Sequence, residues 1–248
     1  MEWLGCPREL RQSLVHHAAN VGGLLGDQLV GLYVHGSVAR GCSNPTTSDV
    51  DVIAVLAGPC MDEIARALAG IHRVSDLPLD AVFVKQCQLL HDVEPTPIEF
   101  VIKPMGSREP RLRGEEHSYF LLDRQDAYEC SIALAGVRFS EFALPLPWHL
   151  VVDRLEELLP HIVPKFKNPT LMLCRIAYSL AHGTLCSKRD AGLWALEGLG
   201  GTWRPLIQKA LDRYARGVAE DADATEALIG LERHCREVLM KMRGSGSG

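Results

Sequence analysis

The spacing of apolar positions changes about halfway along the chain. Short apolar runs of strand length come first, and the longer segments between them have a helical period. These runs predict strands at 28–35, 50–56 and 79–84 and a fourth, strand-like element at 97–102. They also predict helices at 7–25, 37–42 and 60–70.

The second half of the chain has no comparable strand signal. Residues 104–116 have the composition of a loop, and helical periodicity continues after them. Asn168-Pro169 is a typical helix start, and Gly183 is a typical helix end. The predicted helices cover residues 118–136, 148–161, 169–183, 188–199, 203–216 and 220–242.

This change of pattern predicts an α+β protein of two domains. Residues 1–117 would form an α/β domain with a small mixed sheet and flanking helices, and residues 118–243 an all-helical bundle. Residues 244–248, of glycine and serine only, have the composition of an added linker. A cleft between two domains is the usual place for a ligand, so we expect the active site there.

The charge balance limits the class of partner. The chain has 248 residues, a net charge of −5 and no cluster of Lys or Arg. An enzyme that follows a long nucleic acid usually carries a basic stripe, so we expect no nucleic-acid partner. A mildly acidic surface suits a small cationic substrate.

Other features of the composition predict a cytoplasmic protein, either a monomer or a weak dimer. No apolar run is long enough to span a membrane, and the first residues lack the pattern of a signal peptide. The eight cysteines form no C-x-x-C pair, so we expect reduced and mostly buried thiols. His16 and His17 are expected to be ordinary surface or boundary residues.

The candidate chemistry begins where two of the predicted strands meet polar residues. One apolar run ends at Gly36-Ser37, and a second opens with Asp49-Val50-Asp51. Side chains at i and i+2 of a strand share a face, and two adjacent carboxylates repel unless a cation lies between them. Oxygen ligands of this kind suit Mg²⁺, which also binds substrate phosphates. A Gly-Ser pair lets a phosphate approach the backbone closely.

Taken singly, a Gly-Ser pair is a turn and a D-x-D is a solvated strand edge. Together, each on its own strand, they favour a site for Mg²⁺ and a nucleoside triphosphate.

A third carboxylate is expected on a neighbouring strand. Asp80 lies in the apolar run Pro78–Val84, where an unpaired carboxylate would be costly. Glu99, in the run 97–102, is the second candidate by the same reasoning. The alternative for either residue is a salt bridge at the edge of the sheet.

The pattern of an apolar run, Gly-Ser and D-x-D resembles the DNA polymerase β-like nucleotidyltransferase superfamily. The helical half is similar to the C-terminal domain of the aminoglycoside adenylyltransferases that modify streptomycin and spectinomycin. That similarity rests on Arg175-Ile176-Ala177-Tyr178-Ser179 and on further single matches, namely Gly183, Lys188, Trp194-Ala195 and Tyr214.

The resemblance implies a role for each matched residue. Asp49 and Asp51 would bind Mg²⁺, as two ions, and Asp80 would be the general base or would orient the acceptor. ATP would be the co-substrate, bound by residues of both halves: Gly36, Ser37, Ser48, Arg175, Lys188 and Tyr214. The acceptor would contact Asp80, Glu99, Asn168 and Tyr178.

Three positions depart from the family pattern. The base of the family is usually a glutamate, which is one methylene longer than Asp80. Members that modify streptomycin have an acid where this chain has Lys165, and a tryptophan that residues 97–117 lack. A spectinomycin-like acceptor is therefore favoured over streptomycin.

The leading hypothesis is a magnesium-dependent O-adenylyltransferase that transfers AMP from ATP to an aminoglycoside or aminocyclitol and gives antibiotic resistance. Two alternatives stay open. In the first the acceptor is a protein hydroxyl or a metabolite, and in the second the chain is a degenerate homologue that only binds nucleotide.

Overall fold

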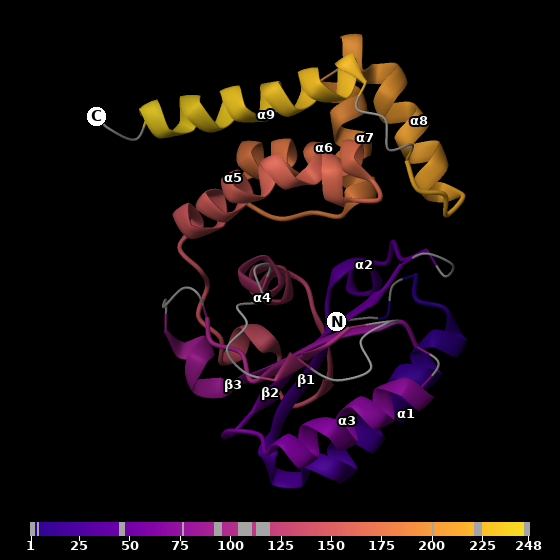
Figure 1. Cartoon of the computed structure of the whole chain (residues 1–248), viewed down its shortest axis with the longest axis vertical. Helices are drawn as coiled ribbons and strands as arrows, with labels where there is room; N and C mark the ends of the chain where they lie inside the picture. The colour runs from indigo at the N-terminus through magenta and orange to yellow at the C-terminus, as the bar shows by residue number, and fades with distance from the viewer. Residues whose placement is uncertain are drawn as a thin grey trace. The chain divides into compact units, whose positions relative to one another are not determined.

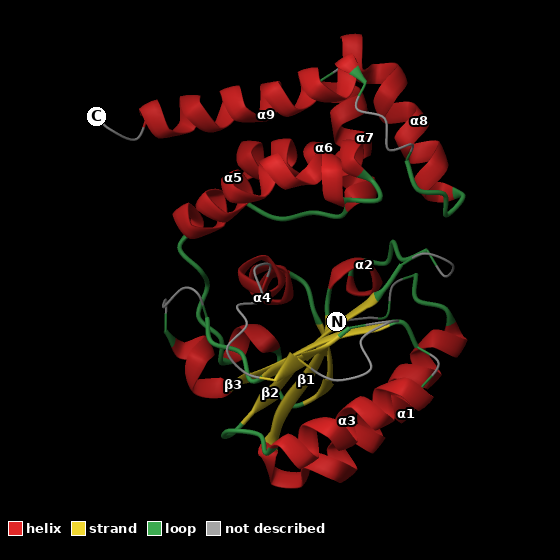
Figure 2. Ribbon diagram, viewed as in Figure 1, coloured by secondary structure: helices red, strands yellow, loops and turns green. Residues whose placement is uncertain are grey.

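The structure is a computed structural model in which two compact units follow one another along the chain, Met1–Leu146 and Pro147–Gly248. It describes residues 3, 5–44, 48–75, 77–91, 96–103, 111–112, 120–199, 201–220 and 225–245. Figure 1 traces the chain through both units, and Figure 2 shows that strands occur in the first of them. The predicted α+β class is confirmed.

The first unit is built on a six-stranded sheet in the order β5-β4-β3-β2-β1-β6. Within the described strands, β2 and β3 run parallel and the other neighbours are antiparallel. The sheet is therefore mixed, as expected from the sequence. Its strands are β1 (Leu29–Val34), β2 (Val50–Leu56), β3 (Leu79–Lys85), β4 (Phe100–Ile102), β5 (Arg111–Leu112) and β6 (Ile132–Ala135).

Alternating side chains place the two faces of this sheet in different cores. Val50, Val52 and Ala54 of β2 pack in one cluster with residues of α1 (Arg8–Leu25) and α3 (Asp62–Val74). Ile53 and Val55 pack in the other cluster, with residues of α4 (Phe120–Glu129) and the 3₁₀ turn η3 (Phe139–Glu141). Figure 2 shows α1 and α3 together on one side of the sheet and α4 on the other. Asp51 alternates with Val50 and Val52, so it lies on the face that α4 covers.

Two parts of the first unit differ from the sequence prediction. Residues 118–136 were expected to be one helix, but α4 ends at Glu129 and β6 follows, paired with β1. The first unit therefore extends to Leu146 instead of ending at residue 117. The predicted loop 104–116 contains β5; residues 104–110 and 113–116 of that segment lie outside the described residues.

The short elements around the sheet complete this unit. α2 (Gly36–Ala39) follows β1, and the 3₁₀ turns η1 (Gly26–Gln28) and η2 (Gln86–Leu90) flank β1 and β3. The helix expected at 37–42 begins one residue earlier, at Gly36, and ends at Ala39; its N-cap is His35, whose side chain makes no capping hydrogen bond.

The second unit is helical throughout its described residues. Its elements are α5 (Trp148–Lys165), α6 (Pro169–His182), α7 (Lys188–Gly198), η4 (Gly201–Trp203), α8 (Arg204–Ala215) and α9 (Glu226–Ser245). α6 is the central helix: ten of its residues are buried, and it packs against α5, α7, α8 and α9. It begins at Pro169 and ends before Gly183, whose backbone is left-handed with φ 65°. The predicted helical half is confirmed from residue 147 onward. No helix among the described residues of either unit is long and apolar enough to cross a membrane.

His17 and His72 form a buried pair between α1 and α3. His17 is 1% exposed, which corrects the expectation of a surface or boundary residue. The two rings lie edge to face, with centroids 4.5 Å apart, and none of their four nitrogens has a hydrogen-bond partner. Burial, aided by the charge of His16, lowers the pKa of His17 to about 4, and burial with the charge of His17 lowers the pKa of His72 to about 3.

This pair predicts a loss of stability in weak acid. In the folded state both pKa values lie below the unfolded value of about 6.5, so the unfolded chain binds more protons below that pH. The stability present above pH 6.5 should therefore fall as pH decreases toward 4, by about 2 kcal/mol per histidine at pH 5. Urea unfolding at pH 7 and pH 5 measures the difference. His72→Phe should reduce it, whereas the exposed His149→Gln, on another helix, should not; equal pH sensitivity in all three proteins would contradict the assignment.

Candidate active site

The ends of β1, β2 and β3 bring three of the sequence-predicted residues together. In the parallel pairing of β2 and β3, Asp51 is in register with Asp80. Neighbouring strands lie about 4.8 Å apart, so these carboxylates occupy adjacent positions on the face covered by α4. Gly36 follows β1 directly, and the backbone N–H of His35 donates to the carbonyl oxygen of Asp51 at 3.0 Å.

Gly36 fits this position because it has no side chain. Its φ is 65°, in the left-handed region that glycine tolerates. A Cβ atom at Gly36 would lie 2.1 Å from Oδ2 of Asp51. The close approach of this backbone to the Asp51 carboxylate therefore requires glycine.

Asp49 and Ser48 lie just before β2. Asp49 is exposed, whereas Asp51 is half-buried within the strand. The Ser48 hydroxyl accepts a hydrogen bond from the backbone N–H of Asn44 at 2.9 Å, and the Ser48 N–H donates to the Asn44 carbonyl at 2.9 Å. Ser48 is thus joined to Asn44 by two hydrogen bonds immediately before the two aspartates.

Asp80 is engaged by a lysine. Nζ of Lys103, just after β4, lies 2.5 Å from Oδ2 of Asp80. The other carboxylate oxygen, Oδ1, is buried and has no hydrogen-bond partner. A buried carboxylate oxygen without a donor is unfavourable, so this position suits a cation or a hydroxyl group supplied by a ligand.

Glu99 lies elsewhere on the sheet. Its N–H donates to the carbonyl of Phe83, three residues further along β3 than Asp80, which is roughly 10 Å at strand spacing. Its carboxylate accepts from the Cys60 N–H at 3.1 Å and pairs with Lys85 at 3.4 Å. The structure therefore brings Asp51 and Asp80 together but does not bring Glu99 to them.

The sequence reasoning missed the acids of α4. Asp123 and Asp126 lie on this helix at i and i+3, a spacing that places both on one side. Burial raises the pKa of Asp123 to about 7; the His35 and Lys103 charges oppose this shift, and the charges of Asp51 and Asp80 reinforce it. The Asp123 carboxyl group is therefore close enough to Asp51 and Asp80 for their negative charges to affect its pKa. The D-x-x-D spacing was the available signal, but this helix had been assigned to the other domain.

His35 and Arg40 balance these carboxylates. Burial alone would lower the pKa of His35, but the hydrogen bond to Asp126 and the charges of Asp51, Asp123 and Asp126 outweigh it and raise that pKa to about 9. Arg40 contacts Asp126 through Nε at 3.0 Å and Nη2 at 2.8 Å, and its Nη2 lies 3.4 Å from Glu129. The Gly-Ser turn thus lies in a charged network of two cationic side chains and several acids.

The remaining predicted residues lie in the helical unit. Arg175 and Tyr178 are half-buried on α6, and Tyr178 stacks on His182 with ring centroids 4.1 Å apart. Lys188 is the first residue of α7, directly after the N-cap Ser187, whose hydroxyl accepts from the Asp190 N–H. Asn168 is the N-cap of α6, and its Oδ1 is buried without a partner. Tyr214 lies half-buried near the end of α8.

Comparisons with known proteins bear on both units. Residues 147–238 match a family model described as the C-terminal domain of aminoglycoside adenylyltransferase. A curated aminoglycoside (3'') (9) adenylyltransferase of Escherichia coli is 34% identical over 107 residues, which is 41% of this chain and 40% of the relative. Its counterpart from Rhizobium radiobacter is 33% identical over 107 residues, 41% of this chain and 39% of the relative. The chain thus spans about two fifths of the length of the curated relatives it matches.

The fold similarity extends over nearly the whole chain. The crystal structure of spectinomycin adenyltransferase AAD(9) from Enterococcus faecialis with ATP and spectinomycin superimposes with a TM-score of 0.74 and 17% identity. The match covers 93% of this chain and 99% of that chain. These matches agree with the resemblance found in the sequence: the helical unit matches the model of the C-terminal domain of aminoglycoside adenylyltransferase, and the chain has the fold of a solved spectinomycin adenyltransferase.

Proposed function

We propose that this chain is an enzyme that transfers AMP from ATP to a hydroxyl of an aminoglycoside or aminocyclitol antibiotic, releases pyrophosphate and gives resistance. The observation that carries the proposal is the register that sets Asp51 beside Asp80, with Gly36 against the Asp51 carboxylate. The family match of residues 147–238 supports the acceptor class. The reaction requires no nucleic acid, and we propose that a monomer or weak dimer in the cytoplasm carries it out.

The residues present fit a magnesium site. The donors are carboxylate oxygens, and the buried Oδ1 of Asp80 lacks a hydrogen-bond partner among the described residues. No group of three or more ligating side chains is arranged for a metal among the described residues. Mg²⁺ usually takes one or two carboxylates and completes its shell with water and substrate phosphates, so Asp49 and Asp51 would suffice, for one ion or two. When bound, Mg²⁺ offsets the negative charge of the phosphates.

The proposed roles of the first unit follow from its geometry. Asp51, and the exposed Asp49 just before β2, would hold the cation, and the phosphates would lie close to the backbone of Gly36 and Ser37. The Gly36 amide already donates to Asp126, so the amides available to a phosphate begin at Ser37. Asp80 accepts the proton of the attacking hydroxyl while Lys103 holds its other oxygen in place.

The helical unit would supply cations for the triphosphate. Arg175 and Lys188 can neutralise phosphate, and Tyr214 can contact the nucleotide, as the resemblance implies. Tyr178 and Asn168 are proposed to contact the acceptor. Lys165, exposed at the end of α5, occupies the position of an acid in streptomycin-modifying members, so a spectinomycin-like acceptor is favoured.

One observation favours a second class of acceptor. Lys103 already neutralises Asp80, which reduces the attraction of this carboxylate for an ammonium group. An uncharged acceptor, such as a protein hydroxyl or a metabolite, would meet less competition there. The reaction type would be unchanged.

Pyrophosphate release tests the proposal directly. Mg-ATP is incubated with the full chain and a panel of aminoglycosides and aminocyclitols, and the adenylylated product is identified by mass. Drug-dependent release supports the proposed function. ATP binding without release for any drug would reject an antibiotic acceptor.

The assignment of the base gives a second prediction. Asp80→Asn should reduce turnover by at least about a hundredfold, because the amide cannot take a proton. Glu99→Gln should stay within about threefold, since Glu99 lies roughly 10 Å along the sheet. Turnover numbers of the two variants under saturating Mg-ATP make the comparison. The reverse order of effects would assign the base to Glu99.

A further inference from the structure

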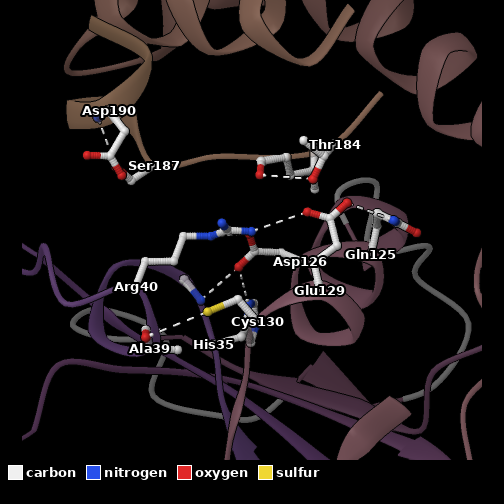
Figure 3. A network of polar contacts seen from close by, with 12 residues as sticks. His35, Ala39, Arg40, Gln125, Asp126, Glu129, Cys130, Thr184, Ser187 and Asp190 are labelled. Carbon is white, nitrogen blue, oxygen red and sulfur yellow. Dashed lines mark hydrogen bonds and ion pairs between the residues drawn. The ribbon is translucent and has the colours of Figure 1, made fainter. Parts of the chain in front are cut away.

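Asp126 connects α4 to the turn that follows β1. Its carboxylate is 4% exposed and lies 90 residues from Gly36 in the sequence. Oδ2 accepts from the Gly36 N–H at 2.8 Å and lies 3.3 Å from Nδ1 of His35. Oδ1 accepts from Arg40, at 2.8 Å and 3.0 Å. Figure 3 shows Asp126 pointing from α4 toward Arg40 and His35.

These contacts restrain a backbone that would otherwise have many conformations. Glycine loses more conformational freedom on folding than any other residue, and Gly36 is held at a φ of 65°. No side chain of α2 caps this short helix. A hydrogen bond to a buried carboxylate is stronger than one between neutral groups, so Asp126 supplies the restraint that the local sequence lacks.

We propose that Asp126 is a positioning residue: through the Gly36 amide it fixes the Gly36-Ser37 backbone beside Asp51 in the geometry that receives the phosphates of ATP. This inference rests on the proposed nucleotidyl transfer. Asp126 itself does not contact the nucleotide. Its carboxylate accepts the Gly36 N–H, which leaves the amides of the following residues, from Ser37 onward, for the phosphates.

The contacts of Asp126 and Arg40 provide a matched pair of variants. Asp126→Asn replaces the charged acceptor of the Gly36 amide and weakens the pair with Arg40. Arg40→Met removes the same ion pair but keeps the Asp126 carboxylate on Gly36. Both variants disturb a buried charge, so both should lose stability. Of the two, Asp126→Asn alone should change the conformation of the Gly36-Ser37 backbone.

The test measures Mg-ATP binding and the Gly36 amide in the full chain, without an acceptor. In Asp126→Asn we expect the dissociation constant of Mg-ATP to rise about tenfold, the effect of losing one charge-assisted hydrogen bond. The Gly36 amide proton should also move upfield in a ¹⁵N-edited spectrum. Arg40→Met should change binding by less than about threefold and leave that resonance near its place.

Equal effects of the two variants on ATP binding would show that lost stability is the cause, and would overturn the proposal. Unchanged binding in Asp126→Asn, or no binding of Mg-ATP to the unmodified chain, would also overturn it. The acceptor is tested separately: ATP binding that depends on Asp126, without drug-dependent pyrophosphate release, would support the positioning role and reject only the antibiotic substrate.

Discussion

Asp51→Asn is expected to reduce drug-dependent pyrophosphate release by about a thousandfold while the protein keeps its fold. A bound divalent ion supplies several kcal/mol of transition-state stabilisation, and each 1.4 kcal/mol is a factor of ten in rate. The amide has the shape of the carboxylate, so the contact with Gly36 is preserved, but it is a far weaker ligand for Mg²⁺. Steady-state rates at several Mg²⁺ concentrations measure the effect.

Thermal unfolding separates this loss from misfolding. Burial is the main cause of the raised pKa of Asp123, and the charges of Asp51 and Asp80 add to it, so the negative charge of Asp51 is unfavourable to its carboxylate neighbours. Removing one of these charges should therefore leave the melting temperature unchanged or raise it slightly. The exposed Asp62→Asn, on α3, is the matched control and should keep full activity. A variant of Asp51 with normal turnover would reject its role as a metal ligand.

The sequence predicts those elements whose pattern is fixed by local burial. After Asp51 and Asp80, β2 and β3 continue as apolar runs up to Leu56 and Val84, because both faces of the sheet are covered. α6 has a proline start and a glycine stop. The candidate aspartates were visible for the same reason: a charged residue at the start of an apolar run is conspicuous.

β6 and β5 were missed because long-range pairing defines them. Ile132–Ala135 is a run of Ile, Ala and Leu that continues the helical pattern of α4, and only its hydrogen bonds to β1 make it a strand. Arg111–Leu112 is two residues long. The error at β6 moved the domain boundary and hid Asp123 and Asp126, since their helix was assigned to the wrong half.

The ion pairs around the site could not be predicted from local sequence patterns either. Lys103 pairs with Asp80 across β3 and β4, and Arg40 with Asp126 over 86 positions of the chain. No local spacing indicates such pairs. They follow from the order of the strands and from the helix that covers them.

Gly36→Ala is expected to abolish measurable transfer, because the new methyl group would lie 2.1 Å from Oδ2 of Asp51. The Gly36 amide is held by Asp126, and the new Cβ would also lie 3.1 Å from Cγ of Asp51, so the Asp51 carboxylate would have to rotate out of its place. The backbone at φ 65° adds strain for any residue with a Cβ. We expect a loss of about 1–3 kcal/mol in the free energy of unfolding and at least a hundredfold loss of turnover.

Gly183→Ala is the control that separates backbone strain from displacement of the carboxylate. Gly183 also has a φ of 65°, but a Cβ there would meet nothing within 4 Å. It should therefore lose about 1 kcal/mol of stability, from strain alone, and keep its activity. Chemical denaturation and pyrophosphate release are measured on both variants. If the two lose activity equally, the close approach of Gly36 to Asp51 does not determine catalysis; if only Gly36→Ala does, the small residue of the Gly-Ser pair is needed for the space it leaves to the Asp51 carboxylate.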